Sequence, residues 1–193
     1  MVGPPDDHPP TEKEGIMPRL QVIEPAGATG KVKEIFDGPL KGKHLNIFKG
    51  LANSPAALQA YLGMSGALGQ GVLTPAEREV ISLAVGEANN CGYCVAAHTM
   101  LGKKAGLAEE QTLQARRGKM DDPRLGALAR FVVTLNEKRG FISDDDLAAF
   151  KSAGYSDGHV AETIACYGLN VFTNYFNHVN DTQIDVPAAP KLD

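Results

Sequence analysis

Several features that mark other classes of protein are missing from this sequence of 193 residues. No apolar run approaches the ~20 residues that a membrane-spanning helix needs. The 19 Lys and Arg residues form no dense basic cluster and the net charge is −4, so a nucleic-acid partner is not expected. Residues 1–16 are polar and proline-rich, and they lack the basic start and apolar stretch of a secretory signal. We therefore expect a protein with neither a membrane nor a nucleic-acid partner.

Cysteine is also scarce, with three residues in the whole chain. Cys91 and Cys94 are too close in sequence to link distant segments, and Cys166 is left without a counterpart. This is not the disulfide framework that holds small secreted domains together. A cytoplasmic, reducing setting fits better, and there a close pair is more often catalytic or metal-binding.

The patterns of β-strands are absent as well, because no stretch alternates polar and apolar residues between turn signals. Apolar residues recur at helical spacing almost throughout. The predicted helices cover residues 28–37, 45–53, 54–69, 74–90, 91–105, 108–117, 122–138, 143–153 and 156–177. We predict an all-α fold with one helical domain over residues 17–193, and we expect residues 1–16 to be disordered or loosely attached.

Two of the predicted helix starts have similar sequences. Thr74 and Glu77 have the spacing of a capping box, and Pro75 occupies the first helical position. The stretch that contains them, LTPAEREVISLAVG, resembles YSDGHVAETIACYG at the start of the last predicted helix. Two interpretations are open: duplicated helical halves, or the ordinary sequence pattern of helix starts.

The stretch NNCGYCVAAHT, residues 89–99, carries the strongest chemical signal. Cys91, Cys94 and His98 stand at i, i+3 and i+7, which puts them on one face of a helix. The preceding asparagines are typical of a turn, so we expect the pair in the first helical turn, where free backbone N–H groups favour negative charge. Thiolate is the reactive form of cysteine, and a helix start next to a histidine favours it. The stretch therefore has the components of a reactive dithiol.

Glu79 is a candidate proton acceptor. It lies on the preceding predicted helix, on one stripe with Leu83, Gly86 and Asn90. If the two helices pack as a hairpin, its carboxylate comes near the cysteines. A partly desolvated carboxylate can accept a proton near neutral pH.

Three other interpretations of the cysteine pair carry less weight. A zinc site would need further ligands, and the candidates are isolated residues: Cys166, His159 and His178. Two inert core cysteines would be unusual beside a Gly-Tyr spacer and two asparagines. A thioredoxin fold would place a strand before Cys91, and none is predicted there.

Together these residues form the pattern E-x(11)-C-x-x-C-x(3)-H, from Glu79 to His98. The pattern and its surroundings, EREVISLAVGEANNCGYCVAAHT, resemble the signature of alkylhydroperoxidase D-like (AhpD-like) proteins in the carboxymuconolactone decarboxylase superfamily, most of all the branch of uncharacterised peroxidase-related proteins. The resemblance extends from about Met17 to Pro187 and includes MPRLQVIEP, GKVKEIFDGPL and NYFNHVNDTQID. It implies an all-helical fold that assembles as a homo-oligomer (dimer, trimer or hexamer), and a peroxidase or dithiol–disulfide function without haem or metal. Members that decarboxylate lactones lack the cysteine pair, so their activity is not expected here.

The resemblance also implies residue roles. Cys94 would attack the peroxide, and Cys91 would then close the disulfide. His98 and Glu79 would accept or relay the proton, and a dihydrolipoyl or thioredoxin-like protein would reduce the pair again. Helix geometry alone instead favours Cys91 as the more acidic thiol, so the order of attack stays open. The best-studied branch has a histidine where this chain has Tyr93, which either donates a hydrogen bond or only packs.

The late segment holds two further candidates, Tyr175 and His178. They lie either near the pocket or an oligomer contact, or at a helix end where they only pack, which is the favoured interpretation. Cys166 stands among apolar residues and is expected to be a small buried hydrophobe. The leading functional hypothesis is a thiol peroxidase for hydrogen or alkyl peroxides, active in antioxidant defence. A dithiol–disulfide carrier or reductase and a binding or scaffold protein with a structural cysteine pair are the alternatives.

Overall fold

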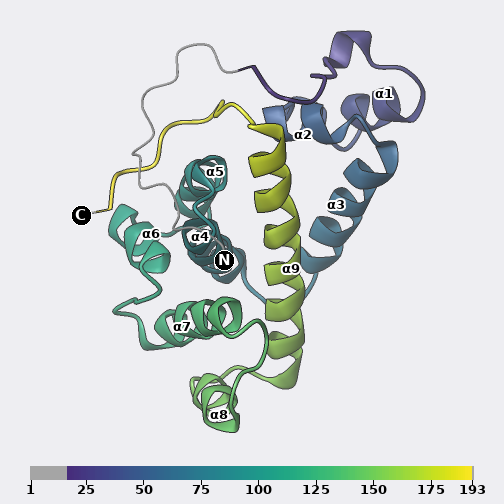
Figure 1. Cartoon of the computed structure of the whole chain (residues 1–193). Coiled ribbons are helices and arrows are strands. Elements are labelled where there is room, and N and C mark those ends of the chain that lie inside the picture. The colour runs from purple at the N-terminus through teal and green to yellow at the C-terminus, as the bar shows by residue number, and fades with distance from the viewer. Residues whose placement is uncertain (1–16, 193) are drawn as a thin grey trace, which may run out of the picture.

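A computed structural model describes residues 17–192, and in this range the chain forms nine α-helices, one short 3-10 helix and no strand (Figure 1). The all-α prediction is confirmed, and every predicted helix has its counterpart. The expectation for residues 1–16 falls outside the described residues. In chain order the elements are η1 (Pro25–Gly27), α1 (Gly30–Asp37), α2 (Asn46–Leu51), α3 (Pro55–Leu68), α4 (Pro75–Ala88), α5 (Gly92–Lys104), α6 (Glu109–Arg116), α7 (Pro123–Glu137), α8 (Asp144–Ser152) and α9 (Asp157–Asn180).

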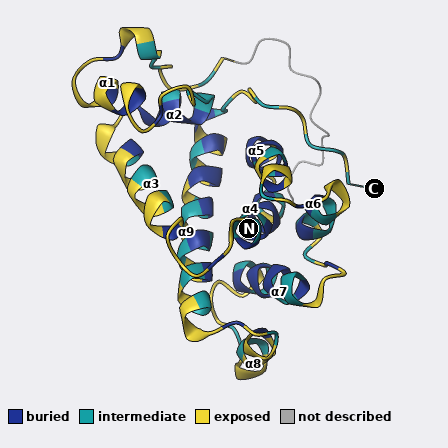
Figure 2. Cartoon of the chain, turned by 180° about the vertical axis from the view of Figure 1, so that it is seen from behind, coloured by how far each residue is buried: buried dark blue, intermediate teal, exposed yellow. Residues whose placement is uncertain are grey.

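α4 lies at the centre of the fold, where it packs against α5, α6, α7 and α9. α9 runs along the length of the molecule, with α3 on one side and α4 and α5 on the other (Figure 1). α3 is largely exposed (Figure 2), since only Leu58 and Leu68 of this helix are buried. None of the described helices is both long and apolar enough to cross a membrane.

Local caps fix the helix starts. Thr74 Oγ1 accepts the Glu77 backbone N–H at 3.2 Å, and the Glu77 carboxylate accepts the Thr74 N–H at 2.8 Å, which confirms the predicted capping box. The same reciprocal arrangement links Ser156 and His159 at the start of α9. The similarity between the two stretches thus includes their caps, as both interpretations of it require. The idea of duplicated halves stays a prediction.

α9 continues three residues beyond its predicted end, to Asn180. Asn180 is the last residue of the helix, and neighbours hold its side chain: Oδ1 accepts the Leu20 N–H at 3.1 Å, and Nδ2 donates to Thr182 Oγ1 at 2.9 Å. The helix ends where Asp181 adopts a left-handed conformation with a φ of 52°.

Two groups of buried apolar side chains make up the core. One surrounds α4, α7, α8 and α9 and includes Leu68 and Cys166. The other surrounds α1, α2 and α5 and includes Phe48, Tyr93 and Cys94. All five of these residues also line one cavity, which therefore lies where the two groups meet.

Candidate functional site

The cysteine pair sits at the junction of α4 and α5. α4 ends at Ala88, and Asn90 turns the chain with a φ of 54°, a conformation that asparagine tolerates better than most residues. Cys91 is the N-cap of α5, and its Sγ accepts the Cys94 backbone N–H at 3.3 Å. The prediction of a pair at a helix start is confirmed, but Cys91 precedes the first turn. The cause is the tight turn, in which the Cys91 N–H donates back to the Gly86 carbonyl at 2.8 Å.

Cys91 and Cys94 are joined by a disulfide and are 1% and 3% exposed, respectively. They differ in what they face, because Cys94 lines the cavity and Cys91 does not. Cys166 is a buried free thiol on the wall of the same cavity. Burial, with a contribution from the charge of Glu79, raises the pKa of Cys166 to about 12, so this thiol is not ionised at neutral pH.

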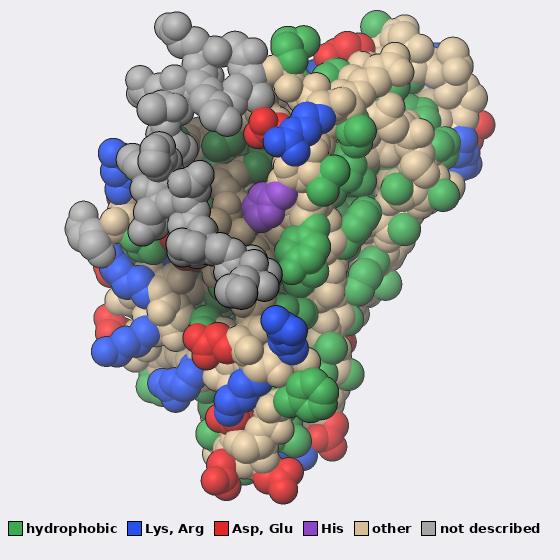
Figure 3. Space-filling model, viewed as in Figure 1, with side chains coloured by type: hydrophobic (Ala, Val, Ile, Leu, Met, Phe, Trp, Pro, Cys, Tyr) green, Lys and Arg blue, Asp and Glu red, His purple; other side chains and the backbone are tan. Residues whose placement is uncertain are grey.

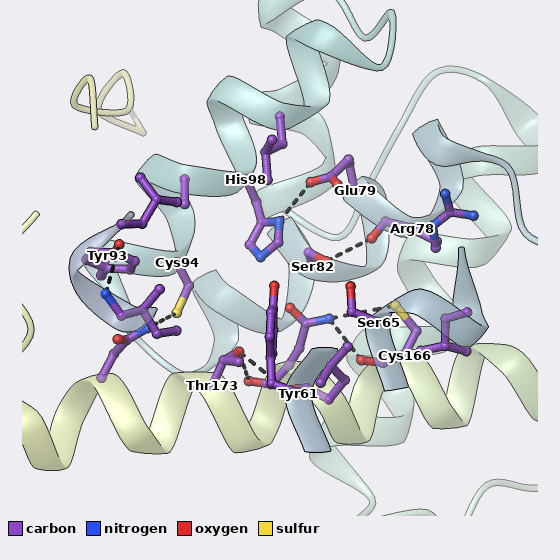
Figure 4. A pocket seen from close by; sticks show the side chains of 18 of the residues that line it. Tyr61, Ser65, Arg78, Glu79, Ser82, Tyr93, Cys94, His98, Cys166 and Thr173 are labelled. Atoms are coloured by element: carbon purple, nitrogen blue, oxygen red, sulfur yellow. Dashed lines mark hydrogen bonds and ion pairs between the residues drawn. The ribbon is translucent and has the colours of Figure 1, made fainter. Parts of the chain in front are cut away.

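The α4–α5 hairpin that the sequence analysis assumed brings Glu79 to His98. Glu79 Oε2 lies 2.7 Å from His98 Nδ1, and the two side chains are 18% and 22% exposed. A carboxylate at Nδ1 favours the tautomer with its proton on Nδ1, which leaves the lone pair of Nε2 free to accept a proton. Figure 4 shows the His98 ring pointing into the cavity, beside Glu79 and above Tyr61.

The cavity has a volume of about 200 Å³, and its walls are mainly apolar. Burial raises the pKa of Tyr61 despite a hydrogen bond with Ser65, so the Tyr61 hydroxyl stays a donor at neutral pH. The cavity can therefore hold a small apolar molecule whose polar end meets Cys94, His98 and Tyr61. Its lining comprises Leu45, Ile47, Phe48, Tyr61, Ser65, Leu68, Arg78, Glu79, Ser82, Tyr93, Cys94, Ala97, His98, Leu101, Cys166, Leu169, Asn170, Thr173 and Asn177.

Tyr93 lines the cavity but uses its hydroxyl to hold the C-terminal segment. Tyr93 Oη donates to Asp185 Oδ1 at 2.9 Å and accepts the Ile47 N–H at 3.4 Å. Burial and the Asp185 carboxylate raise the pKa of Tyr93, so the phenol does not ionise near neutral pH. Of the two interpretations of Tyr93, hydrogen bonding is confirmed, and its partner is the C-terminal segment.

The structure does not bring His178 to the cysteine pair. His178 and Tyr175 are exposed on α9, with their ring centroids 6.5 Å apart, and neither lines the cavity.

Three residues at the site were missed by the sequence analysis: Tyr61, which lines the cavity, Asn177 and Asp185. Asn177 places its Nδ2 atom 3.3 Å from Cys94 Sγ, and Asp185 binds Tyr93. The signal for Asn177 was present: Asn170, Asn174 and Asn177 recur at i, i+4 and i+7, and all three are buried. For Asp185 no local pattern existed.

The described part of the chain offers no set of ligands for the zinc site that was considered as an alternative. Across residues 17–192, no group of three or more His, Cys, Asp or Glu side chains could hold a metal ion. Of the isolated candidates, His159 is bound to Ser156, and His178 is exposed.

The described chain is thus a helical bundle in which the C-x-x-C disulfide and the Glu79–His98 pair lie at one cavity. Residues 55–132, which include Glu79, both cysteines of the pair and His98, match the model of the Carboxymuconolactone decarboxylase family. This match, together with the solved structures described next, supports the resemblance to the AhpD-like proteins of this superfamily that the sequence predicted. No curated protein matches the chain.

Solved structures share the fold over most of the chain. One is described as an alkylhydroperoxidase AhpD core, an uncharacterized peroxidase-related protein from Ralstonia eutropha JMP134, with 24% identity, coverage of 87% of this chain and 92% of that chain, and a TM-score of 0.77. A peroxidase-related protein from Silicibacter sp. TM1040 has 20% identity, 90% and 95% coverage, and a TM-score of 0.77. The debrominase Bmp8, as a cysteine-to-alanine variant with 2,3,4-tribromopyrrole, has 16% identity, 80% and 86% coverage, and a TM-score of 0.67. At these identities the likeness shows the fold, which a debrominase also has.

Proposed function

We propose that this protein is a thiol peroxidase that reduces hydrogen or alkyl hydroperoxides through a dithiol–disulfide cycle, as part of antioxidant defence. One arrangement carries the proposal. Cys94 and His98 line the same cavity, and Glu79 Oε2 lies 2.7 Å from His98 Nδ1, the ring nitrogen that it orients. This arrangement supplies a nucleophile, a proton acceptor and the group that orients the acceptor.

The proposed cycle starts from the reduced cysteine pair. His98 Nε2 takes the proton of the Cys94 thiol, and the thiolate attacks one peroxide oxygen. The O–O bond breaks, the leaving alkoxide takes the proton from His98, and Cys94 becomes a sulfenic acid. The Cys91 thiol then attacks the Cys94 sulfur, the disulfide forms and water leaves. Two electrons pass from the dithiol to the peroxide.

The different surroundings of the two sulfur atoms support Cys94 as the attacking cysteine. Cys94 can be reached from the cavity, whereas Cys91 is 1% exposed and does not line it. The position of Cys91 at the helix start favours its thiolate, but a peroxide in the cavity meets Cys94 first. Cys91 is thus assigned the resolving role.

The depth of the pair favours one of the two expected reductants. Both sulfur-bearing residues are nearly buried, and the C-terminal segment is held near the start of α5 by the Tyr93–Asp185 hydrogen bond. A thioredoxin-like protein must bring a thiol on its own surface to the disulfide, whereas a dihydrolipoyl arm is slim enough to enter the cavity. We therefore propose a dihydrolipoyl protein as the partner and the cytoplasm as the location, because such dithiols stay reduced there.

Homo-oligomer assembly is also part of the proposal, and the exposed sides of α3 and α9 support it. α3 contains no charged residue, yet most of it is exposed. Figure 3 shows hydrophobic side chains gathered along α3 and α9. Monomers rarely expose a large contiguous apolar surface, so we propose that a second copy of the chain covers it. This surface, the α3–α9 face, includes Met64, Ile164, Phe172, Tyr175 and Val179.

The test is mass spectrometry of reduced, metal-free protein after addition of stoichiometric cumene hydroperoxide. We expect the peptide with Cys91 and Cys94 to lose two hydrogens, while Cys166 stays a free thiol. Cys94→Ser should abolish peroxide consumption. Cys91→Ser should consume one equivalent of peroxide and stop at a sulfenic acid on Cys94, which dimedone traps.

The outcomes separate the candidate functions. A dimedone adduct on Cys91 in Cys94→Ser, with none on Cys94 in Cys91→Ser, would reverse the two roles. Thiols that stay reduced in peroxide would contradict the peroxidase proposal. If the pair then exchanges with lipoamide, the protein is a dithiol–disulfide carrier or reductase, a candidate that the same accessible Cys94 supports.

A further inference from the structure

Asn177 brings a side-chain amide to the reacting sulfur atom from outside the α4–α5 hairpin. It belongs to α9, is 4% exposed and lines the cavity. Its Nδ2 atom lies 3.3 Å from Cys94 Sγ and 4.0 Å from Cys91 Sγ. The nearer contact is thus to the cysteine that faces the cavity.

The contact matters most in a state of the pair other than the disulfide. A sulfur atom without charge is a weak hydrogen-bond acceptor, so the amide contributes little to the oxidised form. A thiolate carries a negative charge, and hydrogen bonds to charged groups are roughly twice as strong as those between neutral groups. A charge in such a buried place is costly unless a donor meets it. An amide N–H at this position therefore favours thiolate over thiol.

The oxygen atom of the Asn177 amide also has unusual surroundings. Asn177 Oδ1 is buried and has no hydrogen-bond partner among the described residues. Buried polar atoms without partners are few in folded proteins and call for an explanation. Asn174 Nδ2 is another such atom, but only Asn177 lines the cavity and contacts the cysteine pair. The other nearby donors are engaged elsewhere: the Cys94 backbone N–H donates to Cys91 Sγ, and the Tyr93 hydroxyl donates to Asp185.

We propose that Asn177 is a catalytic residue whose Nδ2–H group stabilises the thiolate of Cys94. Cys91 receives the backbone N–H at the helix start, and Cys94 receives the amide of α9, so each sulfur has a donor of its own. The inference deepens the proposed function, since it takes Cys94 as the attacking thiol.

The test measures the thiolate without peroxide. Reduced protein is alkylated with iodoacetamide between about pH 5 and pH 10, a range that spans ordinary thiol ionisation, and fragment-ion mass spectrometry assigns the adduct to Cys94 or Cys91. Asn177→Ala should move the midpoint of the Cys94 curve upward by about one pH unit, as expected for the loss of a hydrogen bond to a charged group. Asn177→Asp keeps the shape but adds a carboxylate, so it should move the midpoint further. The midpoint is measured in place of the alkylation rate at one pH. A thiol with a higher pKa forms less thiolate, but that thiolate is more nucleophilic, so the two effects on the rate partly cancel.

Asn174→Ala is the matched control. Asn174 is a buried asparagine one turn earlier on α9, but its Oδ1 accepts from Asn89 Nδ2 at 3.0 Å and it does not line the cavity. This variant should leave the midpoint unchanged, with folding checked by circular dichroism. Midpoints of both Asn177 variants at the wild-type value, or a midpoint for Asn177→Asp below that of Asn177→Ala, would overturn the proposal. Because no peroxide is used, failure here and failure of the peroxidase test are distinguishable.

Discussion

At the scale of single residues, the site depends on how one side chain orients another. In the proposed cycle, His98 accepts the Cys94 proton through a free ring nitrogen that faces the cavity. Glu79 occupies the other ring nitrogen at 2.7 Å and leaves Nε2 free. Tyr61 lines the same cavity with a hydroxyl that burial keeps protonated, so it can donate to the leaving oxygen.

Glu79→Gln should therefore lower kcat/KM for cumene hydroperoxide by about 100-fold, the usual contribution of a positioned acid or base. The amide of glutamine can donate to Nδ1, which moves the histidine proton to Nε2 and removes the acceptor. Initial rates of peroxide consumption with dihydrolipoamide as reductant give the measurement.

Glu87→Gln controls for loss of a carboxylate on the same helix. Glu87 pairs with Arg116 at 2.7 Å and does not line the cavity, so this change should leave kcat/KM near the wild-type value. Equal losses in both variants would show that Glu79 acts through the stability of α4 and not through His98.

At the scale of secondary-structure elements, α4 positions Glu79, and Glu77 fixes the start of α4. Glu77 is 3% exposed, caps Thr74 and pairs with Arg124 at 3.1 Å. Burial alone would raise the pKa of Glu77, but the hydrogen bonds from Thr74 and Arg124 outweigh it, and the pKa is lowered. The folded state therefore stabilises the ionised form of Glu77 more strongly than the unfolded state does.

Glu77→Gln should lower the free energy of unfolding by about 1 kcal/mol at neutral pH. The effect stays small because Arg124 is 43% exposed and solvent screens its charge. A lowered folded-state pKa gives stability that is present above the unfolded value of about 4.3 and is lost as the pH falls through the folded value. The difference between wild type and variant, measured by urea unfolding, should thus disappear in acid. A difference that persists unchanged in acid would contradict this origin; Glu110→Gln, at an exposed pair with Arg117, serves as the control.

The helices were predictable because their signals lie within a few residues of each other in the sequence. Some contacts at the site instead join residues that are far apart in the sequence. The caps at Thr74 and Ser156 lie three residues from their partners, and the helices begin where the sequence indicates. Glu79 and His98 were found because a hairpin of adjacent helices is a simple assumption. The contact of Asn177 with Cys94 joins residues 83 positions apart. Side-chain packing of α9 on α5 decides such a contact, and no periodicity encodes it.

At the scale of the whole molecule, the cavity collects residues from α2, α3, α4, α5 and α9. α3 supplies Tyr61 and Ser65 from one side while its other side is exposed and uncharged. A second copy on the α3–α9 face would hold this wall of the cavity in place. Assembly and activity are therefore expected to be coupled.

Phe172→Glu should break the oligomer, because it puts a charge on the α3–α9 face, and a charge buried without a partner is strongly unfavourable. Phe172 is 38% exposed in the single chain. Phe141→Glu is the matched control, since Phe141 is 87% exposed in the loop between α7 and α8 and lies outside this face. Light scattering after size-exclusion chromatography should give a multiple of 20.5 kDa for the wild type and for Phe141→Glu. The Phe172 variant should give the monomer mass and a lower rate of peroxide consumption. A monomeric wild-type protein would refute the proposed assembly. An intact oligomer in Phe172→Glu would show that the interface lies on another surface.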